Sequence, residues 1–179
     1  MEENLLHQKG LYQKQLVQYK ISIPFESITN KNLEELFIEY AENNIMNQCE
    51  KQGYIASHGC KVISYSCGNV VSSKIHYDVL YEFMICLPYE DMTFKCKIQT
   101  ITKIGIRGVL THDENKNPFV VFASYLHNSN IQQTENQTFD EKSNTYKEGD
   151  VILIRVIGHR FEINDPSIYV LAEIINKSN

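Results

Sequence analysis

The sequence predicts an α+β protein in which a sheet that carries one helix is followed by an all-β barrel. Two observations predict this division. In the first half, strands of alternating polarity flank one segment with helical spacing, whereas the second half is almost entirely strand-like. The turn of residues 88–91 begins with a proline and separates the halves. We therefore expect domains at 1–88 and 89–179.

The first half begins with a strand and a helix. Every second residue of 17–25 is apolar, which indicates a strand with one buried face, and Pro24 places the end of this strand at a sheet edge. Residues 33–45 carry apolar side chains at three- and four-residue spacing, with glutamates opposite. We expect a helix here that is capped by Thr29 or Asn30 and packs on the sheet.

Three more strands complete the first half. Short strands are expected at 54–56 and 61–65, and a long strand at 74–87 alternates between two faces. The second face of the long strand becomes apolar towards its end. We therefore expect this part of the face to be covered.

The second half has the strand order of an OB-fold barrel, with three strands, a connection and two strands. Gly105 and Gly108 fall in the second strand, where glycine permits the sharp coiling of a small closed sheet. The connection at 128–145 is polar, and we expect a mobile loop with at most a short helical turn. The expected strands are 94–102, 104–112, 118–125, 150–161 and 167–174.

Charge and hydropathy limit the classes of function. The net charge of −5 argues against broad, unspecific attraction to nucleic acid. The distribution is uneven, however, because residues 94–110 contain basic side chains and no acidic one. No apolar run is long enough to cross a bilayer, and the first residues do not resemble a secretory signal. We expect an intracellular protein with no membrane partner.

The sequence lacks the common catalytic motifs. It has no phosphate-binding glycine loop and no GxSxG, CxxC or HExxH, so we expect no catalytic residue and no cofactor. The five cysteines are irregularly spaced and are expected to be reduced thiols. An open alternative is a zinc or thiol enzyme built on Cys60 and Cys67, with His58 and either Cys49 or His76 as further metal ligands. Because this spacing fits no compact zinc knuckle, we expect no metal.

The remaining chemistry is a surface for single-stranded RNA. OB folds bind single strands with cations that follow the backbone and with aromatic rings that stack on bases. If the arginine-bearing side of the barrel faces outward, basic and aromatic side chains line up on it. In the alternative interpretation, the aromatics pack against the first domain and the cations are merely solvated. The residues expected to bind RNA are Lys95, Lys97, Lys103, Arg107, Phe119, Tyr125, Arg155 and His159.

Short passages in a fixed order run through nearly the whole chain. They are Gln48 to Ile55, Gly68, Tyr77 to Pro88, Lys103 to Ile106, Asn117 to Phe122 and Tyr146 to Val151. This series resembles the stalk subunit of multi-subunit RNA polymerases, which is subunit seven of eukaryotic polymerase II and has a related counterpart in the archaeal enzyme. Two departures are Tyr89-Glu90-Asp91 in place of an acidic Gly-Glu pair, and Ile106 where an aromatic residue is common.

The resemblance implies a non-catalytic subunit of a DNA-directed RNA polymerase. In such proteins an RNP-like N-terminal domain docks on the polymerase core through its tip and pairs with a second stalk subunit that is similar to subunit four. The OB domain holds nascent single-stranded RNA near the exit path. The matching tip in this sequence is the turn formed by Gly68, Asn69, Val70, Val71, Ser72 and Ser73.

The abundance of Asn, Ile and Lys resembles versions of this subunit that are encoded by large DNA viruses. A viral version implies the host cytoplasm and the virion, and a cellular version implies the nucleus. The alternative that stays open is a free-standing OB-fold RNA-binding protein that acts in translation or RNA processing.

Overall fold

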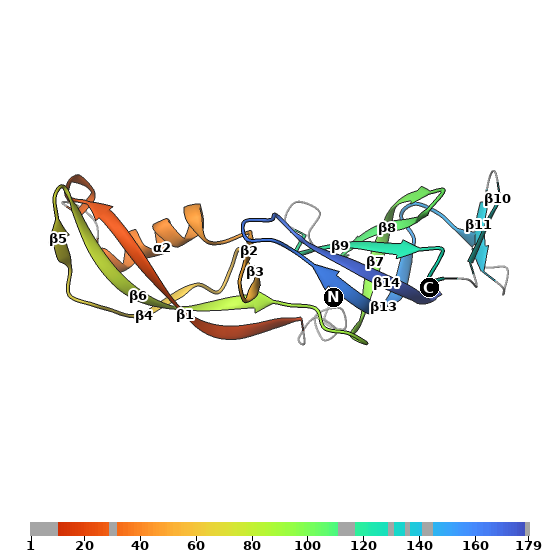
Figure 1. Ribbon diagram of the computed structural model, residues 1–179, viewed down its shortest axis with the longest axis horizontal. Helices are drawn as coiled ribbons and strands as arrows, with labels where there is room; N and C mark the ends of the chain where they lie inside the picture. The colour runs from red at the N-terminus through yellow and green to blue at the C-terminus, as the bar shows by residue number, and fades with distance from the viewer. Residues whose placement is uncertain are drawn as a thin grey trace.

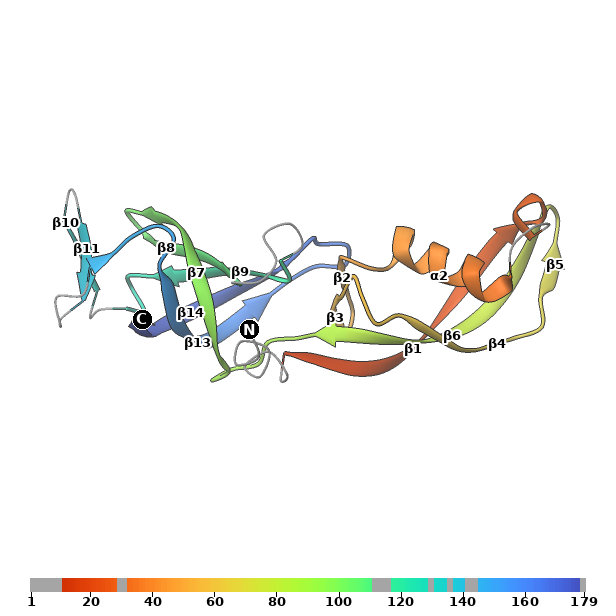
Figure 2. The same cartoon turned by 180° about the vertical axis from the view of Figure 1, so that it is seen from behind.

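The computed structural model describes residues 11–28, 32–110, 117–128, 131–134, 137–140 and 145–177. Within these residues the chain is mostly β structure with one α-helix. The molecule is elongated, with a helix-bearing sheet at one end and a closed five-stranded barrel towards the other (Figure 1). Figure 2 shows the same arrangement from behind. The predicted single helix and the predicted barrel are both confirmed.

One long strand, β6, organises the first half of the chain. Strand β1 pairs with it antiparallel along its whole length and forms one edge of the sheet. On its other side, β5, β4 and β3 pair with successive segments of β6, and β2 lies beyond β3. The bounds are β1 Tyr12–Pro24, β2 Cys49–Glu50, β3 Gly53–Ile55, β4 Lys61–Tyr65, β5 Asn69–Val71 and β6 Lys74–Cys86.

A short 3₁₀ helix, η1 (Phe25–Ile28), and the helix α2 (Leu33–Asn44) connect β1 to β2. The cap of α2 is Asn32, whose side chain accepts a hydrogen bond of 3.4 Å from a backbone N–H in the first turn. The predicted caps, Thr29 and Asn30, lie outside the described residues. The helix therefore begins later than its predicted capping residues.

The apolar stripe of α2 packs against one face of the sheet. Leu36, Phe37 and Ala41 are buried and belong to one cluster with the inward side chains of β1 and β6. The hydroxyl of Tyr81 on β6 donates a 2.8 Å hydrogen bond to the carbonyl of Phe37. This bond satisfies a buried polar group and fixes the helix on the sheet.

The second half forms a closed barrel with the strand order β7–β8–β9–β14–β13. Strands β13 and β7 pair antiparallel and close it, and β9 and β14 are the one parallel pair. This arrangement fits the predicted OB fold. The bounds are β7 Thr93–Thr102, β8 Gly105–Leu110, β9 Phe119–Ser124, β13 Val151–Arg160 and β14 Ile168–Lys177.

The connection between β9 and β13 differs from the expected mobile loop. Its described residues form a small antiparallel sheet of β10 (Ile131–Thr134), β11 (Gln137–Asp140) and β12 (Thr145–Tyr146). Ile131 and Tyr146 are buried in the barrel core cluster. These two apolar side chains anchor both ends of the connection, so that the polar residues between them lie close enough to pair as strands.

The two halves meet at a shared hydrophobic core. Four residues of the first half belong to the same buried cluster as the barrel interior. Strand β2 also pairs with the loop between β13 and β14, because the Cys49 N–H donates to the Asp165 carbonyl and the Asn164 N–H donates to the Cys49 carbonyl, both at 2.8 Å. The junction is therefore packed and hydrogen-bonded. The four shared residues are Leu11, Cys49, Tyr54 and Cys86.

Candidate nucleic-acid interface

Three predicted cations lie where β7 meets β13. Lys95 and Lys97 are half-buried on β7, and Arg155 is exposed on β13. Lys95 pairs in register with Leu153, two residues before Arg155, so these cations share one outer face of the barrel. The Arg155 guanidinium donates to a Glu173 carboxylate oxygen at 2.5 Å, and this hydrogen bond raises the pKa of Arg155. Arg155 therefore has a carboxylate partner on the neighbouring strand.

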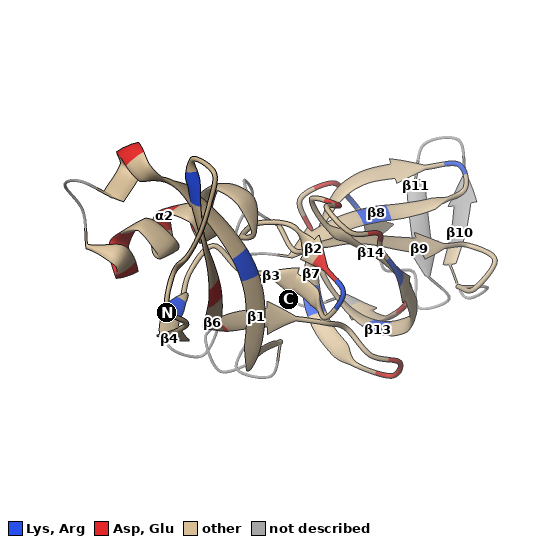
Figure 3. Ribbon diagram, turned by 60° about the vertical axis from the view of Figure 1, so that its left-hand side comes forward, with Lys and Arg blue, Asp and Glu red and all other residues tan. Residues whose placement is uncertain are grey.

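The other predicted cations lie on β8, in the turn between β7 and β8, and near the end of β13. Lys103 is exposed in the turn between β7 and β8, and Arg107 is exposed on β8. His159 is exposed near the end of β13, where its ring stacks on Phe161 with the ring centroids 6.2 Å apart. Figure 3 shows basic residues on several strands and acidic residues on helix α2. The predicted cations therefore lie on β13, β7 and β8, which are neighbouring strands of the barrel, and in the turn between β7 and β8.

The two predicted aromatics are not surface platforms. Phe119 is 0% exposed inside the barrel, where its ring lies 5.2 Å from that of Phe94 between centroids. Tyr125 is half-buried against the barrel core, and its buried hydroxyl has no hydrogen-bond partner in the described part of the chain. This corrects the expectation for Phe119, which is a core residue. The outward residues of β9 are Val120 and Phe122, because side chains alternate along a strand.

Another outer face was missed in the sequence. Backbone pairing places two rows of outward side chains across β8, β9, β14 and β13. Tyr169 in the second row is 53% exposed, and Phe122 in the first row is half-buried. The signal that could have found this face is Glu173, whose charge marks the odd-numbered positions of β14 as outward. The rows are Arg107–Phe122–Leu171–Gly158 and Val109–Val120–Tyr169–Arg160.

A hollow lies on this outer face. Its volume is about 400 Å³, and its lining is apolar and aromatic with basic groups at one side. None of the described residues that line it is acidic. We call it the Gly158 hollow. Its lining residues are Phe122, Gly158, His159, Arg160, Tyr169, Val170 and Leu171.

The six residues of the predicted docking turn lie together at the end of the sheet that is far from the barrel (Figure 1). All six are exposed, and two are large apolar side chains, Val70 at 60% and Val71 at 50% exposed. Phe25, which is 43% exposed, is held beside them because its N–H donates to the Ser73 carbonyl at 3.3 Å. We call Phe25, Val70 and Val71 the apolar tip.

Gly68 has a packing role at the base of this turn. A Cβ atom added to Gly68 would lie 2.5 Å from a methyl group of Ile75 and 2.9 Å from the ring of Tyr77. Such distances are too short for a Cβ atom, so the chain can lie this close to the side chains of β6 because the residue is glycine. The structure therefore explains Gly68 without a partner, unlike the two valines.

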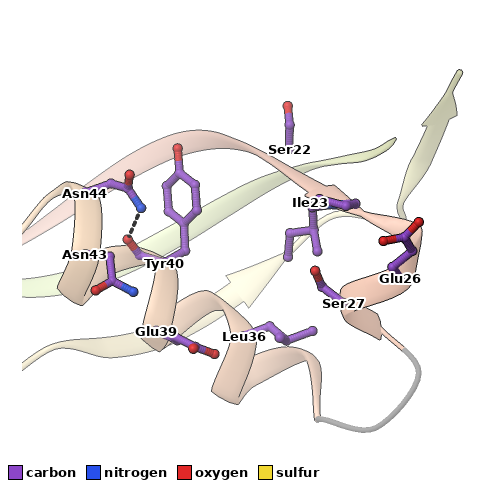
Figure 4. Close-up of a pocket in the computed structure, with 10 residues that line it drawn as sticks. Ser22, Ile23, Glu26, Ser27, Leu36, Glu39, Tyr40, Asn43 and Asn44 are labelled. Atoms are coloured by element: carbon purple, nitrogen blue, oxygen red, sulfur yellow. Dashed lines mark hydrogen bonds between the residues drawn. The ribbon is translucent and has the colours of Figure 1, made fainter. Parts of the chain in front are cut away.

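A second hollow of about 410 Å³ lies between the end of β1, η1 and α2 (Figure 4). Ser22 lines it, and the Ser22 hydroxyl is 2.6 Å from Nδ1 of His76 on β6. Among the described residues, no carboxylate forms a hydrogen bond with the other ring nitrogen of His76. The pair therefore lacks the third group that orients a serine–histidine nucleophile, and it links two neighbouring strands.

Three of the cysteines are placed unfavourably for thiol chemistry, whereas Cys67 is exposed. Burial raises the pKa of Cys49 and of Cys96 to about 12 and that of Cys60 to about 11, so these groups stay protonated at neutral pH. In the part of the chain that the structure describes, no three His, Cys, Asp or Glu side chains are grouped to hold a metal ion. None of the described helices has the length and apolar character needed to span a membrane.

Comparison with known proteins gives one informative relative. No protein-family profile matches the sequence. A protein of Acanthamoeba polyphaga mimivirus, described as "Putative DNA-directed RNA polymerase subunit L376", is 23% identical over 178 residues. The alignment covers 94% of this chain and 84% of the mimivirus protein. The chain is similar to a viral RNA polymerase subunit.

Proposed function

We propose that this protein is a non-catalytic stalk subunit of a DNA-directed RNA polymerase, and that a large DNA virus encodes it. The observation that carries the proposal is the similarity to the mimivirus polymerase subunit along 94% of the chain. A helix-bearing sheet joined to a barrel of OB-like strand order supports the stalk assignment. In this proposal residues 1–88 are an RNP-like docking domain and residues 89–179 are an RNA-binding domain.

The apolar tip is the proposed contact with the polymerase core. Three large apolar side chains at the extreme end of the sheet face solvent, where they are unfavourable unless a partner covers them. The tip is also the part of the sheet farthest from the barrel (Figure 1). The barrel is therefore left free to contact RNA when the tip is docked.

A second stalk subunit is the proposed partner of the remaining exposed apolar residues in the first half. Leu16 on the edge strand β1 is 61% exposed, and Leu87 and Tyr89 at the junction are 42% and 62% exposed. The helix covers the other face of the sheet, so a partner has access to the β1 edge and to the junction. Apolar residues at these two places fit a subunit that lies along the side of the molecule.

The barrel exterior is the proposed RNA surface. Lys103 and Arg107 are exposed and have no acidic residue near them in the sequence, so both are suited to contact phosphates. Lys95, Lys97, Arg155 and His159 supply further positive groups around the barrel. The aromatic platform expected at Phe119 is assigned instead to Phe122 and Tyr169.

Affinity purification from cells that express the tagged, full-length protein tests the proposal. We expect large polymerase subunits and one smaller partner to copurify in stoichiometric amounts. The double variant Val70→Asp, Val71→Asp should lose the large subunits, because charge on the apolar tip opposes its burial. Leu126→Asp is the matched control, since Leu126 is an apolar residue on the barrel that is 91% exposed.

Two outcomes would contradict the proposal. If the wild-type protein purifies alone and still binds RNA, the result would favour the alternative, a free-standing RNA-binding protein. The barrel alone would be sufficient for that function. A tip variant that recovers the large subunits as well as wild type does would remove the tip from the docking surface, while the subunit assignment would stand on the wild-type result.

A further inference from the structure

The Gly158 hollow exists because of an irregularity in β13. The register between β13 and β14 shifts between Val156 and Gly158, so Gly158 lies opposite Leu171 in the outward row. A Cβ atom added to Gly158 would have no neighbour within 4 Å. The row Arg107–Phe122–Leu171 therefore ends at a position where a side chain is missing and the space is open.

The walls of the hollow are suited to a flat ring. Tyr169 projects beside the open position and is 53% exposed, while Phe122 and Leu171 are half-buried and provide an apolar surface. Aromatic side chains of this kind offer a face on which an unpaired base stacks without regard to its sequence. The hollow of about 400 Å³ is large enough for such a ring system and remains open to solvent on one side.

The charges around the hollow fit a phosphate backbone. Arg160 pairs in register with Tyr169 and borders the hollow directly, and Arg107 stands at the other end of the first row. Arg107 lies three strands away in a closed barrel of five, so its side chain projects from another side of the barrel. Arg160 is therefore the arginine that borders the hollow, and it is placed to contact a phosphate next to a bound base.

The neighbouring carboxylates do not cancel this charge. Arg160 forms a 3.3 Å ion pair with Glu162, but both side chains are more than 70% exposed. Exposed pairs of this kind contribute little, so a phosphate can replace Glu162 as the partner. Glu173 is the next outward residue of β14 beyond Leu171, and Arg155 already holds it.

We propose that the Gly158 hollow receives one unpaired base of single-stranded RNA, which stacks on Tyr169, while Arg160 contacts an adjacent phosphate. This inference rests on the proposed function, in which the barrel binds transcript, and it names the subsite. An apolar side chain of a partner protein would also fill such a hollow. Arg160 and the lack of an acidic residue in the described lining favour the polyanion.

Binding of a fluorescein-labelled uridine 12-mer RNA to the full chain tests the subsite. Gly158→Leu fills the hollow, and the added side chain meets open space, so the barrel should stay folded. Gly158→Leu and Tyr169→Ala should each weaken binding at least fivefold and leave the salt dependence of the affinity unchanged, because they remove stacking and no charge. Arg160→Gln should weaken binding and lower the slope of log affinity against log salt by about 1.

Tyr89→Ala is the control for Tyr169→Ala, since Tyr89 is similarly exposed, at 62%, but lies at the junction. Circular dichroism and thermal melting confirm that each variant is folded. Unchanged affinity in Gly158→Leu, with clear wild-type binding, would overturn the subsite and leave the RNA-binding function intact. Absence of wild-type binding would overturn both. Equal binding to a thymidine 12-mer DNA would keep the base subsite and remove the preference for RNA.

A protein contact at the hollow has its own signature. If Gly158→Leu removes a copurifying subunit while RNA affinity stays at the wild-type level, the hollow holds a side chain of that subunit, and the base subsite is refuted.

Discussion

Replacement of Phe119 by alanine should destabilise the barrel. It should have no direct effect on RNA binding. The ring is 0% exposed and packs on Phe94, so the variant loses the full transfer free energy of the ring and leaves a cavity. Phe-to-Ala changes at such sites cost about 3–5 kcal/mol. With a urea dependence of about 2 kcal/mol per molar, the unfolding midpoint of the barrel should fall by about 2 M.

Phe122→Ala is the matched control, because Phe122 belongs to the same strand but points outward and is half-buried. Removal of this ring should cost about 1 kcal/mol, since burial of a whole aromatic side chain is worth about 1.5–3 kcal/mol. Urea unfolding followed by circular dichroism measures both. If Phe119→Ala is no less stable than Phe122→Ala and instead binds RNA more weakly, Phe119 acts at the surface and the assigned faces of β9 are wrong.

Three other contacts carry predictions of their own. Asn128→Ala should lower the free energy of unfolding by about 1–3 kcal/mol in urea melts. The Asn128 side chain is 1% exposed and accepts a 2.6 Å hydrogen bond from the Ile174 N–H. An unchanged urea midpoint would refute this role. Burial raises the pKa of the Cys96 thiol from 9.0 to about 12, so the unfolded chain ionises first. Stability should be constant below the unfolded pKa and fall as pH rises through 9 towards 12, and Cys96→Ala should lack about 1 kcal/mol of this loss at pH 10; equal pH dependence in the two proteins would contradict it. Glu173→Gln removes the carboxylate partner of Arg155 and should raise RNA affinity severalfold at low salt, with no increase at high salt. Fluorescence anisotropy measures the affinity. Unchanged affinity at low salt would exclude this side of the barrel from the RNA path.

The sequence predicts the elements well where one face of a strand differs from the other. Alternation placed the long strands β1 and β6, and the loss of polarity near the end of β6 predicted a cover there. That cover is confirmed, because Cys86 is 0% exposed in the cluster shared with the barrel. Nearby, a Cβ atom on Gly59 would lie 2.6 Å from the Met84 side chain, which shows how closely the preceding loop lies on β6.

Prediction fails where both faces of a strand are apolar. In β9, Phe119 and Phe122 have opposite orientations but similar hydropathy, so alternation alone does not say which one is inside. The choice depends on pairing with β8 and with β14, and β14 is distant in the sequence. The same reason hid Gly158, since a bulge that shifts register depends on the partner strand. For this reason the sequence did not show which aromatic side chains of β9 face outward.

The packed junction has a consequence for the distance between the two ends of the molecule. Hydrogen bonds from Cys49 to the loop of Asn164 and Asp165, together with the common core, prevent the barrel from swivelling independently of the sheet. The sheet and the barrel therefore form one rigid unit. The site at which the far end of the sheet is bound then determines where the barrel lies. Disruption of these junction contacts would shift the barrel relative to the sheet, while every contact at the bound end of the sheet remained unchanged.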